Sequence, residues 1–171
     1  MKNNSKKNLV CFDTAYSLAQ YESGGLEIFT EGKLLNGYFN TIFVINIASN
    51  IKNPDVIGKS KLIKLSDHIE YLDVPLGRFR FLAAFKKINF IFTIFSTLIA
   101  VIRICKKNNI SFIRGEDAEI NGFLAMLISK IMNIPLFIGV WGNPAEIRND
   151  TGKPMWPYLL KFIASFIKSL F

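Results

Sequence analysis

At 171 residues, the chain is long enough for one domain with a substantial core. Half of the residues are hydrophobic and 20% are charged, which excludes intrinsic disorder. The net charge of +8 indicates an anionic partner. A phosphorylated substrate or a membrane surface fits, whereas nucleic acid does not, because the lysines are scattered or paired rather than gathered into one stripe with aromatic residues.

Five short runs rich in Val, Ile, Leu and Phe predict strands. They are Asn8–Phe12, Thr41–Ala48, Ile69–Val74, Ser111–Arg114 and Leu136–Trp141. Nearly continuous apolar runs are typical of a parallel sheet that is covered on both faces. A further short strand, Lys61–Leu65, would form a hairpin with the third run, through a turn that carries His68. We therefore expect this histidine, the only one, at the surface.

Between the strands, three segments predict helices: Gly25–Asn36, Ala83–Lys107 and Ile120–Met132. The residues between the first strand and Gly25 are expected to form a loop. Alternation of strands and helices predicts an α/β fold, a Rossmann-like, doubly wound and mostly parallel sheet. We expect one domain over residues 1–171, with its core in residues 8–154.

The uncharged run from Ile88 to Ile102 raises the question of a membrane, although a spanning helix needs about twenty residues. A weakly polar stripe recurs along this helix at spacings of three and four: Asn89, Thr93, Ser96, Ala100, Arg103 and Lys107. The stripe predicts a packed helix that turns this side to solvent. A small membrane protein anchored by residues 88–105 is the alternative.

The final segment, MWPYLLKFIASFIKSLF (residues 155–171), predicts an amphipathic helix that is apolar over most of its surface. Such a face needs a cover, which a second domain or a membrane would supply. We favour the interpretation that the chain is part of something longer.

The two cysteines, Cys11 and Cys105, lie far apart in apolar segments and predict buried, reduced thiols in a cytosolic protein. Only four apolar residues stand between the basic start of the chain and Asp13, so we expect no export signal. We also expect no metal, because no Cys/His ligand set or calcium-loop spacing is present. The sequence lacks G-x-G-x-x-G, Walker A and G-x-S-x-G motifs, so it gives no support for those nucleotide sites or for Ser–His catalysis.

In open α/β sheets, ligands bind beyond the carboxyl ends of the strands. In the loop after the first strand, Gly24 and Gly25 would let the backbone approach a phosphate. After the fourth run, Arg114 could bind an anion through its guanidinium, and Glu116 could act as an acid, a base or a hydroxyl acceptor. The alternative is structural: Glu116 or Asp117 caps the following helix, while Glu119 complements the helix dipole.

Two further groups of residues line the same expected edge. Asn121 and Gly122, at the start of the next helix, could bind sugar hydroxyls. In the last loop, Gly142 allows close backbone approach and Asn143 can donate and accept hydrogen bonds. Trp141 could stack on a sugar, although a core position is the commoner role for tryptophan.

The stretch KNNISFIRGEDAEINGFLAMLISKIMNIPLFIGVWGNPAEIR resembles the middle of the N-terminal domain of GT-B glycosyltransferases, specifically the family-4-like retaining enzymes. The earlier ESGGLEIFTEGKLL is similar to the glycine loop and first helix of that domain. The resemblance covers roughly residues 8–171. Trp141 stands where many members of that family carry histidine. We therefore do not assign the catalytic contact of that histidine to Trp141.

The resemblance implies one half of a two-domain enzyme that moves a sugar from a nucleotide diphosphate sugar to a hydroxyl, without a metal or other cofactor. Gly24 and Gly25 would approach the donor diphosphate. The residues implied for the acceptor are Arg114, Glu116, Asp117, Asn121, Gly142 and Asn143. A C-terminal domain, separately encoded or lost, would bind the donor, so this half should be inactive alone.

The acceptor implied is a sugar or lipid-linked sugar in polysaccharide or lipopolysaccharide synthesis. The protein would then be cytoplasmic, at the inner face of the plasma membrane. The alternative is a non-enzymatic, flavodoxin-like module that binds partners through its apolar C-terminal helix.

Overall fold

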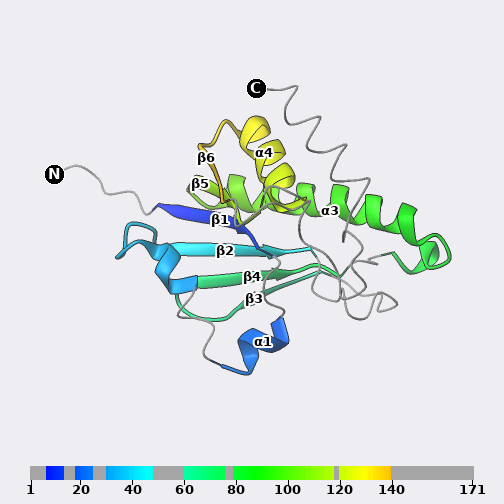
Figure 1. Cartoon of the computed structure of the whole chain (residues 1–171), viewed down its shortest axis with the longest axis horizontal. Coiled ribbons are helices and arrows are strands. Elements are labelled where there is room, and N and C mark those ends of the chain that lie inside the picture. The colour runs from blue at the N-terminus through cyan, green and yellow to red at the C-terminus, as the bar shows by residue number, and fades with distance from the viewer. Residues whose placement is uncertain are drawn as a thin grey trace, which may run out of the picture.

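The computed structural model describes residues 7–13, 18–24, 30–47, 60–75, 79–117 and 120–139. A six-stranded sheet forms the centre, in the order β3-β4-β2-β1-β5-β6 (Figure 1). The strands are β1 (Asn8–Phe12), β2 (Thr41–Asn46), β3 (Lys61–Lys64), β4 (Ile69–Asp73), β5 (Ile110–Gly115) and β6 (Leu136–Ile138). All pairings are parallel except that of the edge strand β3 with β4. The predicted α/β, Rossmann-like fold and the predicted hairpin are confirmed.

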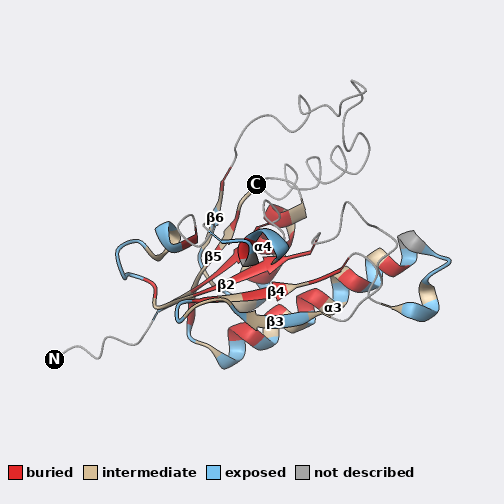
Figure 2. Cartoon of the chain, turned by 90° about the horizontal axis from the view of Figure 1, so that it is seen from below, coloured by how far each residue is buried: buried red, intermediate tan, exposed pale blue. Residues whose placement is uncertain are grey.

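Helices lie on both faces of this sheet. α3 (Lys86–Lys107) and α4 (Ile120–Met132) cover one face, while α1 (Leu18–Glu22) and the short 3-10 helix η1 (Gly32–Leu34) lie on the other (Figure 1). A second 3-10 helix, η2 (Arg80–Leu82), precedes α3. Alternate residues of each strand point to opposite faces, so each face has its own apolar core. Buried residues therefore run through the inner strands β1, β2, β4 and β5 (Figure 2), whereas the edge strands β3 and β6 have none.

The first helical region differs from the prediction. A short helix, α1, occupies part of the expected loop before Gly24. It ends because Gly24 takes a positive φ of 94° and donates its N–H to the carbonyl of Tyr21. Residues 25–29 lie outside the described part. Beyond them, η1 ends at Leu35, which is in the left-handed conformation, just before the expected end of the predicted helix.

The rotation of α3 contradicts the prediction that its polar stripe faces solvent in the first half of the helix, although Arg103 and Lys107 near its end are exposed as predicted. Asn89 and Thr93 are 3% and 1% exposed, whereas Phe92 and Phe95 are 52% and 60% exposed. The polar groups tolerate burial because they are satisfied locally. Asn89 exchanges two hydrogen bonds with the backbone of Phe79, at 2.9 and 2.8 Å. The Thr93 hydroxyl donates to the Asn89 carbonyl at 2.8 Å.

Three further predictions are confirmed: the bounds of one helix, the exposure of the histidine and the burial of both cysteines. α4 has the predicted bounds. His68 is exposed on the turn between β3 and β4, and Cys11 and Cys105 are buried free thiols. One helix in the described part, Ile88–Lys107, is long and apolar enough to cross a membrane by length and composition alone. The segment 155–171 lies outside the described residues.

Candidate functional site

The direction in which successive strands are added to the sheet reverses between β1 and β5, because β2 and β4 lie on one side of β1 while β5 and β6 lie on the other. Such a topological switch point is where open α/β sheets bind ligands, beyond the carboxyl ends of the strands. Cys11 of β1 pairs in register with Arg114 of β5. Asp13 and Glu116 directly follow these two strands. The sheet therefore gathers four polar side chains at its switch point.

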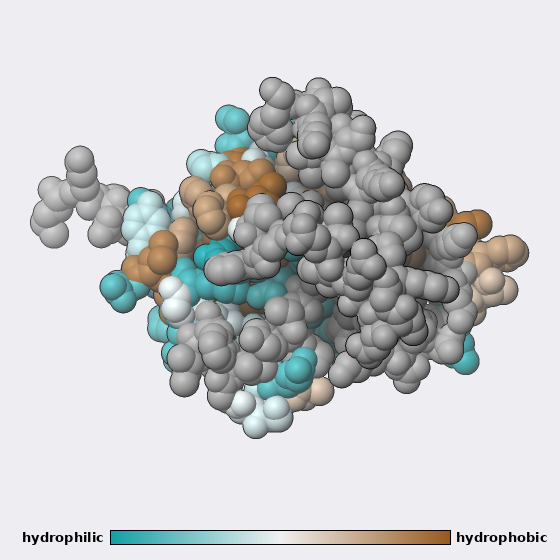
Figure 3. Space-filling model, viewed as in Figure 1, coloured by the Kyte–Doolittle hydropathy of each residue, from teal (hydrophilic) through white to brown (hydrophobic). Residues whose placement is uncertain are grey.

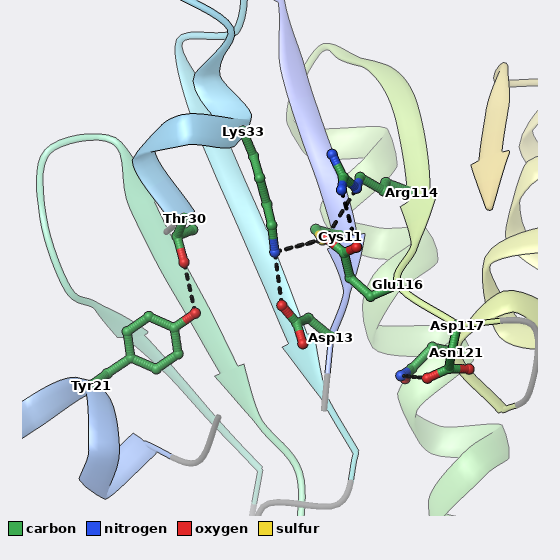
Figure 4. A network of polar contacts seen from close by, with 9 residues as sticks. All are labelled: Cys11, Asp13, Tyr21, Thr30, Lys33, Arg114, Glu116, Asp117 and Asn121. Atoms are coloured by element: carbon green, nitrogen blue, oxygen red, sulfur yellow. Dashed lines mark hydrogen bonds and ion pairs between the residues drawn. The ribbon is translucent and has the colours of Figure 1, made fainter. Parts of the chain in front are cut away.

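A fifth side chain, Lys33 of η1, reaches into this group (Figure 4). Its Nζ lies 2.7 Å from Oδ2 of Asp13 and 2.8 Å from Oε1 of Glu116. Its exposed side-chain fraction is 14%, against 6% for Asp13 and 12% for Glu116. We call Cys11, Asp13, Lys33, Arg114 and Glu116 the switch-point cluster. It ties the β1–β2 connection to the residue after β5.

Arg114 holds the other side of Glu116. Its Nη2 donates a 3.1 Å hydrogen bond to Oε2, and its Nε lies 3.0 Å from Oε1. The guanidinium also lies over the ring of Phe137 in β6, 5.5 Å from the ring centroid. The exposed side-chain fraction of Arg114 is 24%, which is larger than that of Lys33 or Glu116. Arg114 is thus the cation of the cluster that solvent reaches most easily.

The charge states follow from these contacts. Burial acts to raise the pKa of Glu116, but the hydrogen bond and charge of Lys33, followed by Arg114, outweigh it and lower that pKa below its ordinary value. Burial acts to lower the pKa of Lys33, but Cys11, Asp13 and Glu116 raise it above its ordinary value. At neutral pH the cluster therefore holds an ionised Glu116 and a protonated Lys33. An ionised carboxylate accepts hydrogen bonds and is unsuited to act as a general acid.

The thiol of Cys11 belongs to the same contacts. Burial raises its pKa far above the ordinary value, so the group is a neutral thiol at neutral pH. Its Sγ lies 3.4 Å from Oε1 of Glu116 and 3.7 Å from Nζ of Lys33. Cys11, Asp13 and Glu116 could together ligate a metal ion. In this structure, the ammonium of Lys33 contacts all three and supplies the positive charge.

A trough of about 330 Å³ adjoins the cluster on the η1 face of the sheet. Lys33 and Arg114 supply its polar groups, and the rest of the lining is apolar: Leu9, Leu35, Tyr38, Phe39, Phe112 and Phe137. A mostly apolar wall with a few convergent polar groups is typical of a small-molecule site.

Asp117 and Asn121 lie apart from the cluster, at the start of α4 (Figure 4). The Asn121 amide donates to Oδ2 of Asp117, and Asn121 is only 1% exposed. Gly115 and Gly122 explain why this corner is so tight. A Cβ on Gly115 would lie 2.8 Å from Cα of Gly122, and a Cβ on Gly122 would overlap the Asp117 carbonyl. The structure therefore gives these residues a role in packing α4 against β5.

Of the predicted site residues, the structure thus brings Arg114 and Glu116 together, while Asp117 and Asn121 lie apart from them at the start of α4. Gly24 lies at the end of α1, where it closes that helix. Gly25, Gly142, Asn143, Glu119 and Trp141 lie outside the described residues.

The predicted site did not include Cys11, Asp13 or Lys33. Asp13 could have been predicted, because it directly follows the predicted first strand, just as Glu116 closely follows the predicted fourth strand. Lys33 has no such signal, since only the tertiary fold brings η1 over the end of β1. Comparisons with protein-family models, with curated proteins and with solved structures find no match for this chain.

Proposed function

We propose that the chain is the acceptor-binding domain of a glycosyltransferase that uses a nucleotide diphosphate sugar as donor. The observation that carries this proposal is the position of the switch-point cluster, at the carboxyl ends of β1 and β5 and beside an aromatic trough. The family resemblance of the sequence is the second support.

The chemistry of the cluster fits a hydroxyl-bearing ligand. Lys33 and Arg114 keep Glu116 ionised, so its carboxylate can accept hydrogen bonds from sugar hydroxyls. Arg114 is exposed enough to donate to a hydroxyl or to an anionic group of the acceptor. Tyr38 and Phe137, both about half exposed, offer flat apolar surfaces to the C–H face of a sugar ring. In this role Glu116 and Arg114 position the acceptor.

The proposed enzyme is completed by a second domain that binds the nucleotide sugar, so the chain alone does not transfer sugar. The donor diphosphate would be stabilised by N–H donors, including those near Gly24 and Gly25, and by cations. No step of the proposed reaction needs a metal or another cofactor. We place the enzyme on the cytoplasmic side of a membrane, where a lipid-linked acceptor would be met.

Sequencing the gene beyond codon 171, in all reading frames, tests this proposal. A following stretch that encodes a second βα domain with a Glu-x7-Glu pattern is the expected result. Both parts are then produced together and assayed for sugar release from nucleotide diphosphate sugars. Unrelated sequence after a stop codon would contradict the two-domain proposal and favour the flavodoxin-like binding module.

A further inference from the structure

The exposed side of α3 is apolar over most of its length. Ile88, Ile91, Phe92, Phe95 and Ile99 are between 45% and 60% exposed and follow helical spacing along one side. Phe81 of η2 and Phe85, at 79% and 60% exposed, extend the same apolar surface toward the start of the helix. We call these seven residues the α3 apolar face. In Figure 3, hydrophobic surface is visible at the end of the molecule where η2 and the start of α3 lie.

The orientation of this face is fixed by contacts on the opposite side of α3. Leu98, Val101 and Ile104 belong to the core between α3 and the sheet. Asn89 is bound through both side-chain atoms to the backbone of Phe79. Rotating the helix would break these contacts and expose the buried Thr97. The apolar side therefore faces outward as a stable feature of the fold.

An apolar groove runs beside this face, between α3 and α4. It has a volume of about 210 Å³, and every residue that lines it is hydrophobic: Phe90, Ile91, Ile94, Phe95, Ile120, Phe123 and Leu124. Ile91 and Phe95 belong both to the groove and to the α3 apolar face. The groove thus widens the outward-facing apolar surface.

The charges around the face are of one sign. Between residues 75 and 113 the sequence has seven basic residues and no acidic residue; the basic ones are Arg78, Arg80, Lys86, Lys87, Arg103, Lys106 and Lys107. Arg80 is exposed near the start of α3, and Arg103, Lys106 and Lys107 are exposed near its end. With 22 residues, the helix is roughly 33 Å long. Such a surface suits a partner that is both apolar and anionic.

We propose that the α3 apolar face is a docking surface for an anionic lipid bilayer, with α3 lying in the plane of the membrane. The apolar side chains would enter the boundary between headgroups and acyl chains, and the basic residues at both ends would contact anionic headgroups. A second copy of this chain fits less well, because pairing two such faces would bring the basic residues of both copies together.

Docking in the plane is favoured over spanning by the packing of the helix. A spanning α3 would have to leave the sheet and uncover Leu98 and Val101. It would also lose the two hydrogen bonds between Asn89 and the backbone of Phe79. In-plane docking keeps all these contacts. This inference stands on α3 and its surroundings and does not rest on the proposed sugar transfer.

Vesicle flotation of the full chain tests the proposal. We expect binding to vesicles of phosphatidylcholine with phosphatidylglycerol and little binding to phosphatidylcholine alone. The double variant Phe92→Asp/Phe95→Asp should lose this binding. The matched control, Leu62→Asp, changes an apolar residue of β3 that is 50% exposed, and it should bind like the unchanged chain. Circular dichroism and thermal unfolding show that each variant is folded.

The charge contribution is measured separately. Arg103→Glu and Lys106→Glu should each weaken binding to the anionic vesicles by at least about fivefold, as expected for one basic residue near such a surface. Lys61→Glu and Lys130→Glu, which change exposed lysines on β3 and near the end of α4, serve as controls. An unchanged affinity in the α3 variants would contradict the electrostatic part of the proposal.

A fluorescent label reports whether α3 itself meets the lipid. Because Cys11 and Cys105 are buried, a cysteine introduced as Phe95→Cys can be labelled selectively with an environment-sensitive dye. Its emission should shift to the blue with anionic vesicles, whereas the same dye after Leu62→Cys should not respond.

Three outcomes would overturn the proposal. The first is unchanged vesicle binding by the Phe92→Asp/Phe95→Asp variant. The second is retention in the membrane pellet after alkaline carbonate, which would indicate a spanning helix. The third is that the unchanged chain does not bind vesicles but self-associates without lipid, and that the Phe92→Asp/Phe95→Asp variant no longer self-associates. This result would assign the face to a second copy.

Discussion

The Nζ atom of Lys33 lies 2.8 Å from Oε1 of Glu116 and joins the β1–β2 connection to the residue that follows β5. The same ammonium contacts Asp13 at 2.7 Å, so one partly buried cation is shared by two carboxylates. Arg114 completes the group from the other side of Glu116. The local charges are therefore balanced by residues from three parts of the chain, and this balance is the basis of the first two predictions.

Replacement of Lys33 by methionine should destabilise the fold, because it leaves Asp13 and Glu116 without their shared cation. Breaking a buried ion pair in this way typically costs about 3–5 kcal/mol of unfolding free energy. Urea unfolding measures the loss. The triple variant Lys33→Met/Asp13→Asn/Glu116→Gln should recover much of it, since no uncompensated charge then remains.

The control for this prediction is Lys61→Met, which removes an exposed lysine of β3 and should change stability by less than about 0.5 kcal/mol. Equal effects of Lys33→Met and Lys61→Met would show that the switch-point cluster does not stabilise the fold.

Acid should destabilise the protein partly through Glu116. Its pKa is lowered in the folded state, so the unfolded chain binds this proton more readily. The stability that Glu116 supplies is present above its ordinary pKa of 4.5 and is lost as the pH falls through the lowered value. Thermal unfolding followed from neutral pH to roughly pH 3 should show a steeper loss in the unchanged chain than in Glu116→Gln. The variant Glu70→Gln, on β4, is the control. If Glu116→Gln loses stability with falling pH as steeply as the unchanged chain, Glu116 is not the group responsible.

Alkaline pH should also reduce stability. Burial raises the pKa of Cys11 far above its ordinary value and that of Cys105 to about 11. Above the ordinary thiol pKa of about 8.5 the unfolded chain loses these protons first, so rising pH favours unfolding. The protonated, buried thiols should resist iodoacetamide in the native state and react in denaturant. Mass spectrometry counts the labelled sites, and rapid native labelling of Cys11 would contradict its burial.

Gly115 and Gly122 should tolerate no side chain. Gly115→Ala and Gly122→Ala place a Cβ against backbone atoms, and overpacking of this kind typically costs about 1–3 kcal/mol. Gly32→Ala is the matched control, because nothing lies within 4 Å of the added Cβ. Urea unfolding compares the three variants. Equal stability would mean that α4 moves away from β5 without cost.

Much of the fold could be predicted from the sequence, because strand runs and helix periods are local signals. The bounds of α4 and the β3–β4 hairpin are examples. The outward side of α3 could not be predicted, because Asn89 and Thr93 satisfy their polar groups through bonds to nearby backbone and therefore tolerate burial. A polar stripe alone does not reveal such bonds.

The candidate site was predicted in part for the same reason. Arg114 and Glu116 follow a recognisable strand, so their position at the sheet edge is readable from the sequence. Lys33 is far from both in sequence and meets Glu116 only after η1 packs over β1. Asn121 has a residue type that suits sugar binding, but its burial and its bond to Asp117 depend on the close approach of two glycines.

The central claim, that the switch-point cluster and its trough bind an acceptor sugar, is tested most directly by NMR titration of the folded chain with a panel of methyl hexosides. At least one sugar should shift the amide resonances of Tyr38, Phe112, Arg114 and Phe137. Glu116→Gln should weaken the binding of that sugar about tenfold, because a hydrogen bond to a charged group is lost. Glu70→Gln should leave the affinity for the sugar unchanged. If no sugar of the panel binds, or if binding leaves the trough resonances and the Glu116→Gln affinity unchanged, the claim is contradicted.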